Sequence, residues 1–214
     1  SDNVTGINSA SYTADWALAA GNWPLLLPGT NYASVRVFDY TGNSSTTVDA
    51  FTIWKDTIPP FIADNQPGDD NWRKTDPGAI YDVDFKDLES FFTTAQYRIY
   101  DAAGQTGNLV KDWTFIVSST LTPSYINNWG IDFASAREGV NYISVKLYDR
   151  AGLASTFNDV FYVKKDTSVP VITDNQAGDA AWKNAPGTVY NIDFKDLASG
   201  LTTIQYQIST TPAQ

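Results

Sequence analysis

The sequence predicts an all-β protein built from tandem β-sandwich repeats of about 110 residues. Apolar and polar residues alternate with period two in short runs, as in Tyr81, Val83 and Phe85, which is typical of half-buried strands. No stretch repeats apolar residues at helical spacing for more than about two turns. A long segment of the first half also recurs in the second half.

Composition and charge exclude several classes of protein. With 43% hydrophobic and 14% aromatic residues, the 214-residue chain can bury the core of one large or two ordinary domains. Its net charge of −10 and pI near 4.2 repel phosphate backbones and anionic lipids. Because the chain also has no run of about 18 apolar residues, we expect no nucleic-acid partner and no membrane insertion. Cations, sugars and other proteins remain as partners.

The internal repeat is the strongest signal in the sequence. Asn31 to Thr57 aligns without gaps on Asn141 to Thr167, with 13 of 27 positions identical and a shift of 110. Two further segments match at shifts of 110 and 109: Pro59 to Trp72 with Val169 to Trp182, and Tyr81 to Leu88 with Tyr190 to Leu197. Each return of the pattern predicts another copy of the same fold.

Turn residues divide each repeat into short strands. Clusters such as Asp76-Pro77-Gly78 and Ala151-Gly152 interrupt the alternating runs every 8 to 15 residues. This spacing favours a sandwich of about seven strands, and the lack of βαβ alternation argues against a parallel sheet. We expect strands near 59–64, 79–85, 93–100, 109–116, 126–133, 140–149 and 158–165.

Two motifs carry a resemblance to a known family. Tyr148-Asp149-Arg150-Ala151-Gly152 precedes the last strand of a repeat, and Asp166-Thr167-Ser168-Val169-Pro170 follows it; Asp39 and Asp56 begin the same motifs one repeat earlier. The arrangement resembles the bacterial immunoglobulin-like repeats of large extracellular and surface proteins. The resemblance implies tandem immunoglobulin-like sandwiches of about seven antiparallel strands and a place outside the cell or on its surface.

The same motifs predict the domain boundaries. If Asp-Thr-x-x-Pro opens each domain, residues 58–167 are a complete repeat, residues 1–57 the C-terminal half of one and residues 168–214 the N-terminal half of another. Either the segment belongs to a longer array, or separate subunits complete each other head to tail. Both alternatives predict a fibre, because a half sandwich exposes an apolar face and unpaired strand edges.

Catalysis is not expected. Histidine and cysteine are absent, which excludes Ser-His-Asp and Cys-His catalysis and the usual transition-metal ligands. Carboxylate pairs such as Asp82 with Asp84 are more typical of a solvated sheet face than of a glycosidase site. We therefore expect a structural segment of a filament, stalk or sheath, or alternatively an adhesive or carbohydrate-binding module of a surface protein.

Four acidic residues are candidate Ca²⁺ ligands. Asp64 and Asp69 lie in the loop DNQPGDD, and Asp174 and Asp179 occupy the matching loop one repeat later. Calcium takes several oxygen ligands, so such a loop could wrap the ion. Asp, Asn and Gly are equally the residues that turns require. No other cofactor is indicated.

The repeat junctions form a second group of candidates. Asp56 and Asp166 could stiffen the linkers by hydrogen bonds or join a cation site between domains. Pro59, Pro60 and Pro170 restrict the backbone, so we expect short and fairly rigid junctions.

The tryptophans fall into two classes. Trp72 and Trp182 occupy matching positions, as do Trp16 and Trp129, which favours a structural role in the core or at a junction. Trp23 and Trp54 have no tryptophan counterpart. These two are candidates for a surface contact with a sugar or with a neighbouring strand.

Overall fold

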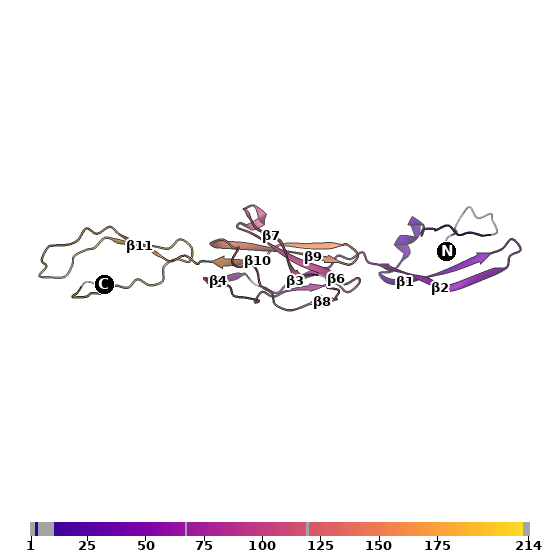
Figure 1. Ribbon diagram of the computed structural model, residues 1–214, viewed down its shortest axis with the longest axis horizontal. Coiled ribbons are helices and arrows are strands. Elements are labelled where there is room, and N and C mark those ends of the chain that lie inside the picture. Colours follow the sequence, from indigo (N-terminus) through magenta and orange to yellow (C-terminus); the bar gives the residue numbers. More distant parts are fainter. Residues whose placement is uncertain (1–2, 4–10, 67, 119, 212–214) are drawn as a thin grey trace.

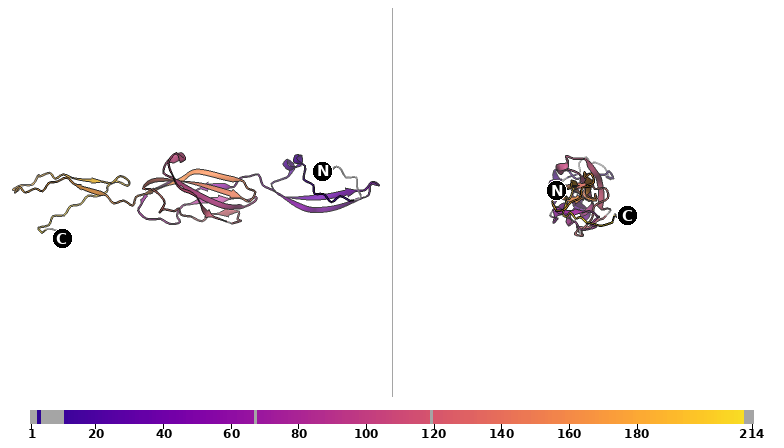
Figure 2. Two further views of the ribbon diagram at one scale, coloured as in Figure 1. Left: turned by 45° about the horizontal axis from the view of Figure 1, so that its top comes forward. Right: turned by 90° about the vertical axis from the view of Figure 1, so that its left-hand side faces the viewer.

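The computed structural model describes residues 3, 11–66, 68–118 and 120–211. Strands dominate these residues, accompanied by two short 3₁₀ helices, η1 (Ala20–Leu25) and η2 (Ala103–Gln105). The chain forms three parts in a row, with the N- and C-terminal parts at opposite ends of a thicker central part (Figure 1). Seen end-on, the three parts lie behind one another, so the molecule is rod-shaped (Figure 2). The prediction of an all-β fold is confirmed.

Two sheets enclose the core of the central part. One sheet has the strand order β4-β10-β9-β6-β7 and the other has the order β3-β5-β8. Their bounds are β3 (Phe61–Asp64), β4 (Asp69–Arg73), β5 (Val83–Lys86), β6 (Phe92–Tyr100), β7 (Leu109–Val117), β8 (Ser124–Tyr125), β9 (Gly139–Asp149) and β10 (Ala154–Lys165).

Alternation of side chains explains why these strands face each other. In β9, Ile143, Val145 and Leu147 are buried, whereas Tyr142 and Lys146 between and beside them are partly exposed. The inward residues of β3, β5, β6, β9 and β10 form one hydrophobic cluster with Trp129. Trp129 is 4% exposed, and its indole N–H donates to the carbonyl of Val83. The tryptophan thus joins the interior to the backbone of β5.

Three details of the expected central domain were wrong. The expected strand over 126–133 is absent from the described residues; a two-residue strand at Ser124–Tyr125 and an isolated bridge between Tyr81 and Trp129 replace it. The acidic loop contains an additional strand, β4, giving eight strands in this region rather than about seven. Finally, β4 pairs in parallel with β10 at the sheet edge, although all other strand pairs are antiparallel.

The N-terminal part has the local structure of β9 and β10. Its two strands, β1 (Gly29–Phe38) and β2 (Ser44–Lys55), pair as an antiparallel hairpin. Asn31 Oδ1 accepts a hydrogen bond from the amide of Leu27, and Asn31 Nδ2 donates to the carbonyls of Leu27 and Gly29. Asn141 makes the same three hydrogen bonds, with the amide of Arg137 and the carbonyls of Arg137 and Gly139. The matched segments therefore adopt the same local conformation in both places.

A lysine contact extends this correspondence. Lys55 Nζ donates to the carbonyls of Trp23 and Leu26 at 3.1 and 2.8 Å. Lys165 Nζ donates at 3.1 and 2.8 Å to Phe133 and Ala136, the residues 110 positions later. Trp23 thus occupies the place of Phe133, a residue of the central core.

The C-terminal part has the same strand pairing as the beginning of the central part. Its strands β11 (Val171–Asp174) and β12 (Ile192–Lys195) pair antiparallel, as β3 and β5 do. Residues 201–209, the counterpart of β6, form no strand. In the central part β6 pairs on one side with β9 and on the other with β7, and the C-terminal part has neither partner.

The central part and the two end parts differ in whether their side chains are buried. Every buried residue among those described lies between Pro60 and Asp166. Most residues of the two end parts that correspond to core positions are exposed, namely Trp16, Val35, Val37, Phe51, Ile172, Tyr190, Ile192, Leu201, Ile204, Tyr206 and Ile208, while Ala33, Ile53 and Phe194 are partly buried. The end parts therefore have core side chains but no enclosed core.

Candidate functional site at the junctions

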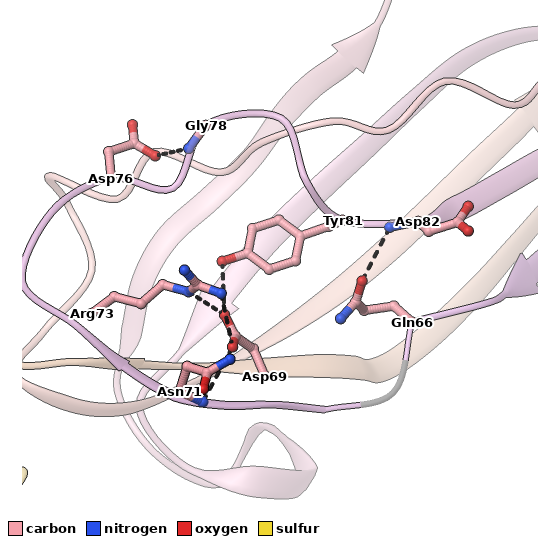
Figure 3. Close-up of polar contacts among 8 residues, drawn as sticks. All are labelled: Gln66, Asp69, Asn71, Arg73, Asp76, Gly78, Tyr81 and Asp82. Atoms are coloured by element: carbon pink, nitrogen blue, oxygen red, sulfur yellow. Dashed lines mark hydrogen bonds and ion pairs between the residues drawn. The ribbon is translucent and has the colours of Figure 1, made fainter.

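Asp69, a predicted calcium ligand, lies inside an ion pair instead. Its carboxylate accepts two hydrogen bonds from the guanidinium of Arg73, at 2.6 and 3.2 Å, and one from the Tyr81 hydroxyl at 3.5 Å (Figure 3). Burial of Tyr81, together with the nearby carboxylate of Asp69, raises the pKa of the phenol. Both oxygens of Asp69 are engaged, and the group anchors β4 against the core.

The other three predicted calcium ligands lie in turns. Asp64 accepts a hydrogen bond from the amide of Gln66, and Asp174 accepts the matching bond from Gln176. Asp179 accepts from the amide of Ala181 and lies 3.4 Å from the Lys183 ammonium. The predicted ligands Asp64, Asp69, Asp174 and Asp179 are therefore positioned as turn-forming or ion-paired residues.

We expect Asp69→Asn to lower the free energy of unfolding of the central part by about 2 kcal/mol, because it removes a charged partner from a largely buried ion pair. Urea unfolding with and without Ca²⁺ distinguishes a role of Asp69 in the ion pair with Arg73 from a role in calcium binding. The loss should be the same in both conditions if Asp69 acts through Arg73. Asp179→Asn, the same change one repeat later in an exposed turn, should cost less than about 0.5 kcal/mol.

The junction residues also form turns. Asp56 Oδ1 accepts a hydrogen bond from the amide of Ile58 at 2.9 Å, and Asp166 Oδ1 accepts the matching bond from Ser168 at 3.0 Å. Pro60 is fully buried in the central part, whereas its counterpart Pro170 and the neighbouring Pro59 are exposed. Each linker thus begins with the same local hydrogen bond.

Three aspartates converge at the first junction. Asp56 follows β2, Asp87 follows β5, and Asp149 ends β9. One carboxylate oxygen from each lies within 4.8 Å of the others, and this is the group of three acidic side chains found among the described residues. Folding therefore gathers carboxylates that are 31 and 62 positions apart in the sequence.

The backbone holds these carboxylates in place. Asp87 Oδ1 accepts hydrogen bonds from the amides of Glu89, Ser90 and Phe91, and Asp149 Oδ1 accepts one from Leu153. The second oxygens of Asp56 and Asp149 are buried and have no hydrogen-bond partner. Asp87 and Asp149 are 5% and 4% exposed.

Within the described structure, no lysine or arginine forms an ion pair with the cluster. None of the five ion pairs among the described residues includes Asp56, Asp87 or Asp149. Burial, and then the charges of the other two aspartates, raise the pKa of Asp149. A cluster of this kind can bind a cation or share a proton.

No protein-family model, curated protein or solved structure matches the chain. Within the described part, no helix is long and apolar enough to cross a membrane.

Asp82 and Asp84, the carboxylate pair considered for catalysis, share one hydrogen-bond donor. The side-chain amide of Asn65 donates to Asp82 Oδ1 at 3.5 Å and to Asp84 Oδ2 at 2.9 Å.

The paired tryptophans differ between the parts. Trp129 packs among Tyr81, Phe85, Tyr97 and Phe161 in the core. Its counterpart Trp16 contacts Phe51 with ring centroids 5.9 Å apart, close to the 5.6 Å between Trp129 and Phe161. Trp16 is nevertheless exposed. Trp72 is exposed at the edge of β4, and Trp182 is exposed in the C-terminal part.

Trp23 and Trp54, the predicted surface contacts, have different surroundings. Trp23 is 44% exposed and lines a shallow groove with Trp16 and Phe51, on the face that corresponds to the central core. Trp54 is 66% exposed, and the guanidinium of Arg150 lies 5.5 Å from its ring centre. Trp54 thus contacts the neighbouring part of its own chain at the first junction.

Proposed function

We propose that the chain is a non-enzymatic structural segment of an extracellular filament, stalk or sheath. Its end parts join head to tail with neighbouring units and complete immunoglobulin-like sandwiches. The observation that carries this proposal is the exposure of side chains in both end parts whose counterparts form the central core. The N-terminal part matches the second half of the central part, and the C-terminal part matches the first half.

Strand pairing in the central part provides the template. There β9 pairs with β10 on one edge and with β6 on the other. Its counterpart β1 pairs with β2 on one edge, and its other edge has no strand partner among the described residues. Residues 201–209, the counterpart of β6, also have no strand partner within the part of the chain that the structure describes. Adding this segment of one unit to β1 of the next reproduces the central sheet by strand addition.

The sequences of the two segments support this pairing. Residues 201–208 read LTTIQYQI and match FTTAQYRI at 92–99. Phe91 and Gly200, which precede the two segments, both have positive φ, 67° and 80°. These angles place both segments after the same turn.

The facing side chains of the proposed joint are apolar, as they are in the central part. There Ala95 faces Leu147, and the matching pair between units would be Ile204 with Val37. Ile204 has three carbon atoms more than Ala95 and Val37 has one fewer than Leu147, so the smaller valine offsets part of the added volume.

The strand order supports the immunoglobulin-like assignment. In the constant-type fold, the first, second, fourth and fifth strands share one sheet, while the third, sixth and seventh share the other. The central part has β3, β5 and β8 in one sheet and β4, β6, β7, β9 and β10 in the other. With β3 and β4 taken as two halves of the first strand, the other positions correspond in order except the fourth, because β7 lies beside β6.

Polymer growth follows from the geometry of the ends. The two end parts present different surfaces at opposite ends of a rod (Figures 1 and 2). Contacts between unlike surfaces produce rings or open filaments, and a straight rod favours a filament. The exposed apolar faces would otherwise promote aggregation.

Cysteine cross-linking tests the pairing and its register. The chain has no cysteine, so Arg36→Cys and Gln205→Cys each introduce one thiol. Their counterparts Lys146 and Gln96 lie directly opposite each other in the central sheet. Such positions are about 4.5–5.5 Å apart between Cα atoms, within the range a disulfide spans. An oxidised equimolar mixture should yield a covalent dimer at twice the 23.5 kDa chain mass.

A cysteine placed two residues out of register is the matched control. Gln207→Cys moves the thiol two residues along the same face, about 7–8 Å from Arg36→Cys, where disulfide formation is unfavourable. This mixture should cross-link at least about ten times more slowly. Equal rates for the two mixtures, or no dimer in either, would contradict the proposed joint.

The exposed Trp54 favours one alternative function, an adhesive or carbohydrate-binding module. Its ring is 66% exposed, although Arg150 contacts it. Trp54→Ala separates the two functions, because a sugar site that uses this ring would lose glycan binding while head-to-tail assembly persisted. Glycan-array binding of the wild-type chain and of this variant is the measurement.

A further inference from the structure

We propose that Asp56, Asp87 and Asp149 bind Ca²⁺ at the junction between the N-terminal and central parts. An unfinished copy of this site, made of Asp166 and Asp196, is completed by Asp39 of the next unit. The first site needs only this chain. The second rests on the proposed head-to-tail function.

The uncompensated charge at the first junction calls for a cation. Asp149 is 4% exposed, and its Oδ2 is buried without a hydrogen-bond partner. The buried Oδ2 of Asp56 also lacks a partner. Burying a carboxylate is costly unless it is paired, hydrogen-bonded or bound to a metal. Since no lysine or arginine forms an ion pair with these residues in the described structure, a metal ion would supply the missing charge.

The spacing of the oxygens fits calcium. Ca²⁺ binds oxygen at 2.3–2.6 Å, so two of its ligands can be up to about 5 Å apart. The three carboxylate oxygens lie within 4.8 Å of one another. Ser90 Oγ, next to this cluster in sequence, is also buried and without a hydrogen-bond partner. An all-oxygen donor set with no nitrogen or sulfur favours a hard cation.

The same residue types recur at the second junction. Asp166 and Asp196 correspond to Asp56 and Asp87, and both line the cleft beside Trp72. Unlike Oδ2 of Asp56, Oδ2 of Asp166 accepts a hydrogen bond, from the amide of Ser199 at 3.1 Å. Asp196 Oδ1 accepts hydrogen bonds from the amides of Ala198 and Gly200, as Asp87 Oδ1 does from its own turn. Among the described residues no third acidic side chain joins these two.

Asp39 is the counterpart of Asp149, although both of its carboxylate oxygens accept hydrogen bonds from Thr41 and Asn43 in the unassembled chain. Its turn matches that of Asp149: the amide of Asp39 donates to the carbonyl of Asn43, and the amide of Asp149 donates to that of Leu153. Gly42 and Gly152 in these turns share a φ of 89°. When β1 of one unit pairs with residues 201–209 of another as β9 pairs with β6, Asp39 arrives where Asp149 lies in the central part.

Calcium titration of the unassembled chain tests the first site. Isothermal titration with CaCl₂ after EDTA treatment and dialysis should give one binding event per chain. At about 100 times the Kd, Ca²⁺ should raise the Tm of the central part by about 10 °C. Asp149→Asn should weaken binding at least about tenfold. Asp56→Asn, which changes the linker rather than the core, should do the same.

Asp39→Asn is the matched control, because this residue lies on an equivalent turn but outside the first site. It should leave calcium binding by the unassembled chain unchanged. The first site is overturned if Ca²⁺ changes neither heat nor Tm, or if Asp149→Asn binds calcium like the wild type. Stabilisation by Asp149→Asn with no calcium effect would show that the aspartates share a proton instead.

Assembled material tests the second site. Its bound calcium, measured after removal of free ion, should rise from one to two ions per chain. In assemblies of Asp39→Asn it should stay at one, and in assemblies of Asp149→Asn only the second site should fill. One ion per wild-type chain after verified cross-linking would overturn the second site while leaving the joint intact. If the chain binds calcium but no cross-link forms, the first site is supported and the proposed joint is wrong.

Discussion

Ile204→Asp is expected to abolish head-to-tail assembly. Ile204 is exposed in the single chain, but its counterpart Ala95 is fully buried beside Leu147. In the completed sandwich the new carboxylate would be buried without a partner, at a cost of several kcal/mol. Since each 1.4 kcal/mol changes an equilibrium constant tenfold, the association constant should fall at least about 100-fold. Sedimentation velocity and negative-stain microscopy measure the loss of filaments.

Gln207→Asp is the control for added charge. Residue 207 corresponds to Arg98, whose side chain is partly exposed and lies over the ring of Trp113. Because Ile204 and Gln207 differ in position by an odd number, their side chains point to opposite faces of the strand. The control variant should assemble with less than about a threefold change. If both variants assembled equally well, residues 201–209 would not be buried in the joint.

Trp129→Ala should reduce the stability of the central part by about 3–5 kcal/mol. The change removes a large buried ring that contacts four other aromatic residues. It also leaves the buried carbonyl of Val83 without the indole donor. Because the total free energy of unfolding of a typical domain is only about 5–15 kcal/mol, the urea concentration at the unfolding midpoint should fall steeply.

Trp16→Ala provides the comparison, since the two tryptophans hold matching positions. In the unassembled chain, Trp16 is exposed and contacts Phe51, so its loss should change the unfolding of the central part by less than about 0.5 kcal/mol. In the assembled state the same change should weaken association strongly. An equal effect of both substitutions on the unassembled chain would refute the view that the N-terminal part lacks an enclosed core.

Much of the fold could be predicted because strand alternation and the repeat are local in the sequence. The strands expected at 140–149 and 93–100 lie close to the observed β9 and β6. The acidic loop was a turn in the prediction because Asp, Asn and Gly are turn formers. There β4 forms through its pairing with β10 and the Asp69 to Arg73 ion pair, which are tertiary effects.

The candidate site was harder to predict, because its members meet only in the folded chain. Asp56 was expected at a junction, but Asp87 and Asp149 come from separate strand ends of the central part. A signal was present in the repeat, since all three positions are aspartate in both copies. Asp64 and Asp69 are also aspartate in both copies. Identity between repeats therefore could not separate a candidate ligand from a turn former.

Amide hydrogen exchange over residues 201–209 tests the central claim most directly. In the unassembled chain these residues belong to no strand, so their amides should exchange rapidly. In assembled material they should become as protected as those of β6, which pair with β9 and β7. Rapid exchange of this segment within verified filaments would show that the units join in some other way.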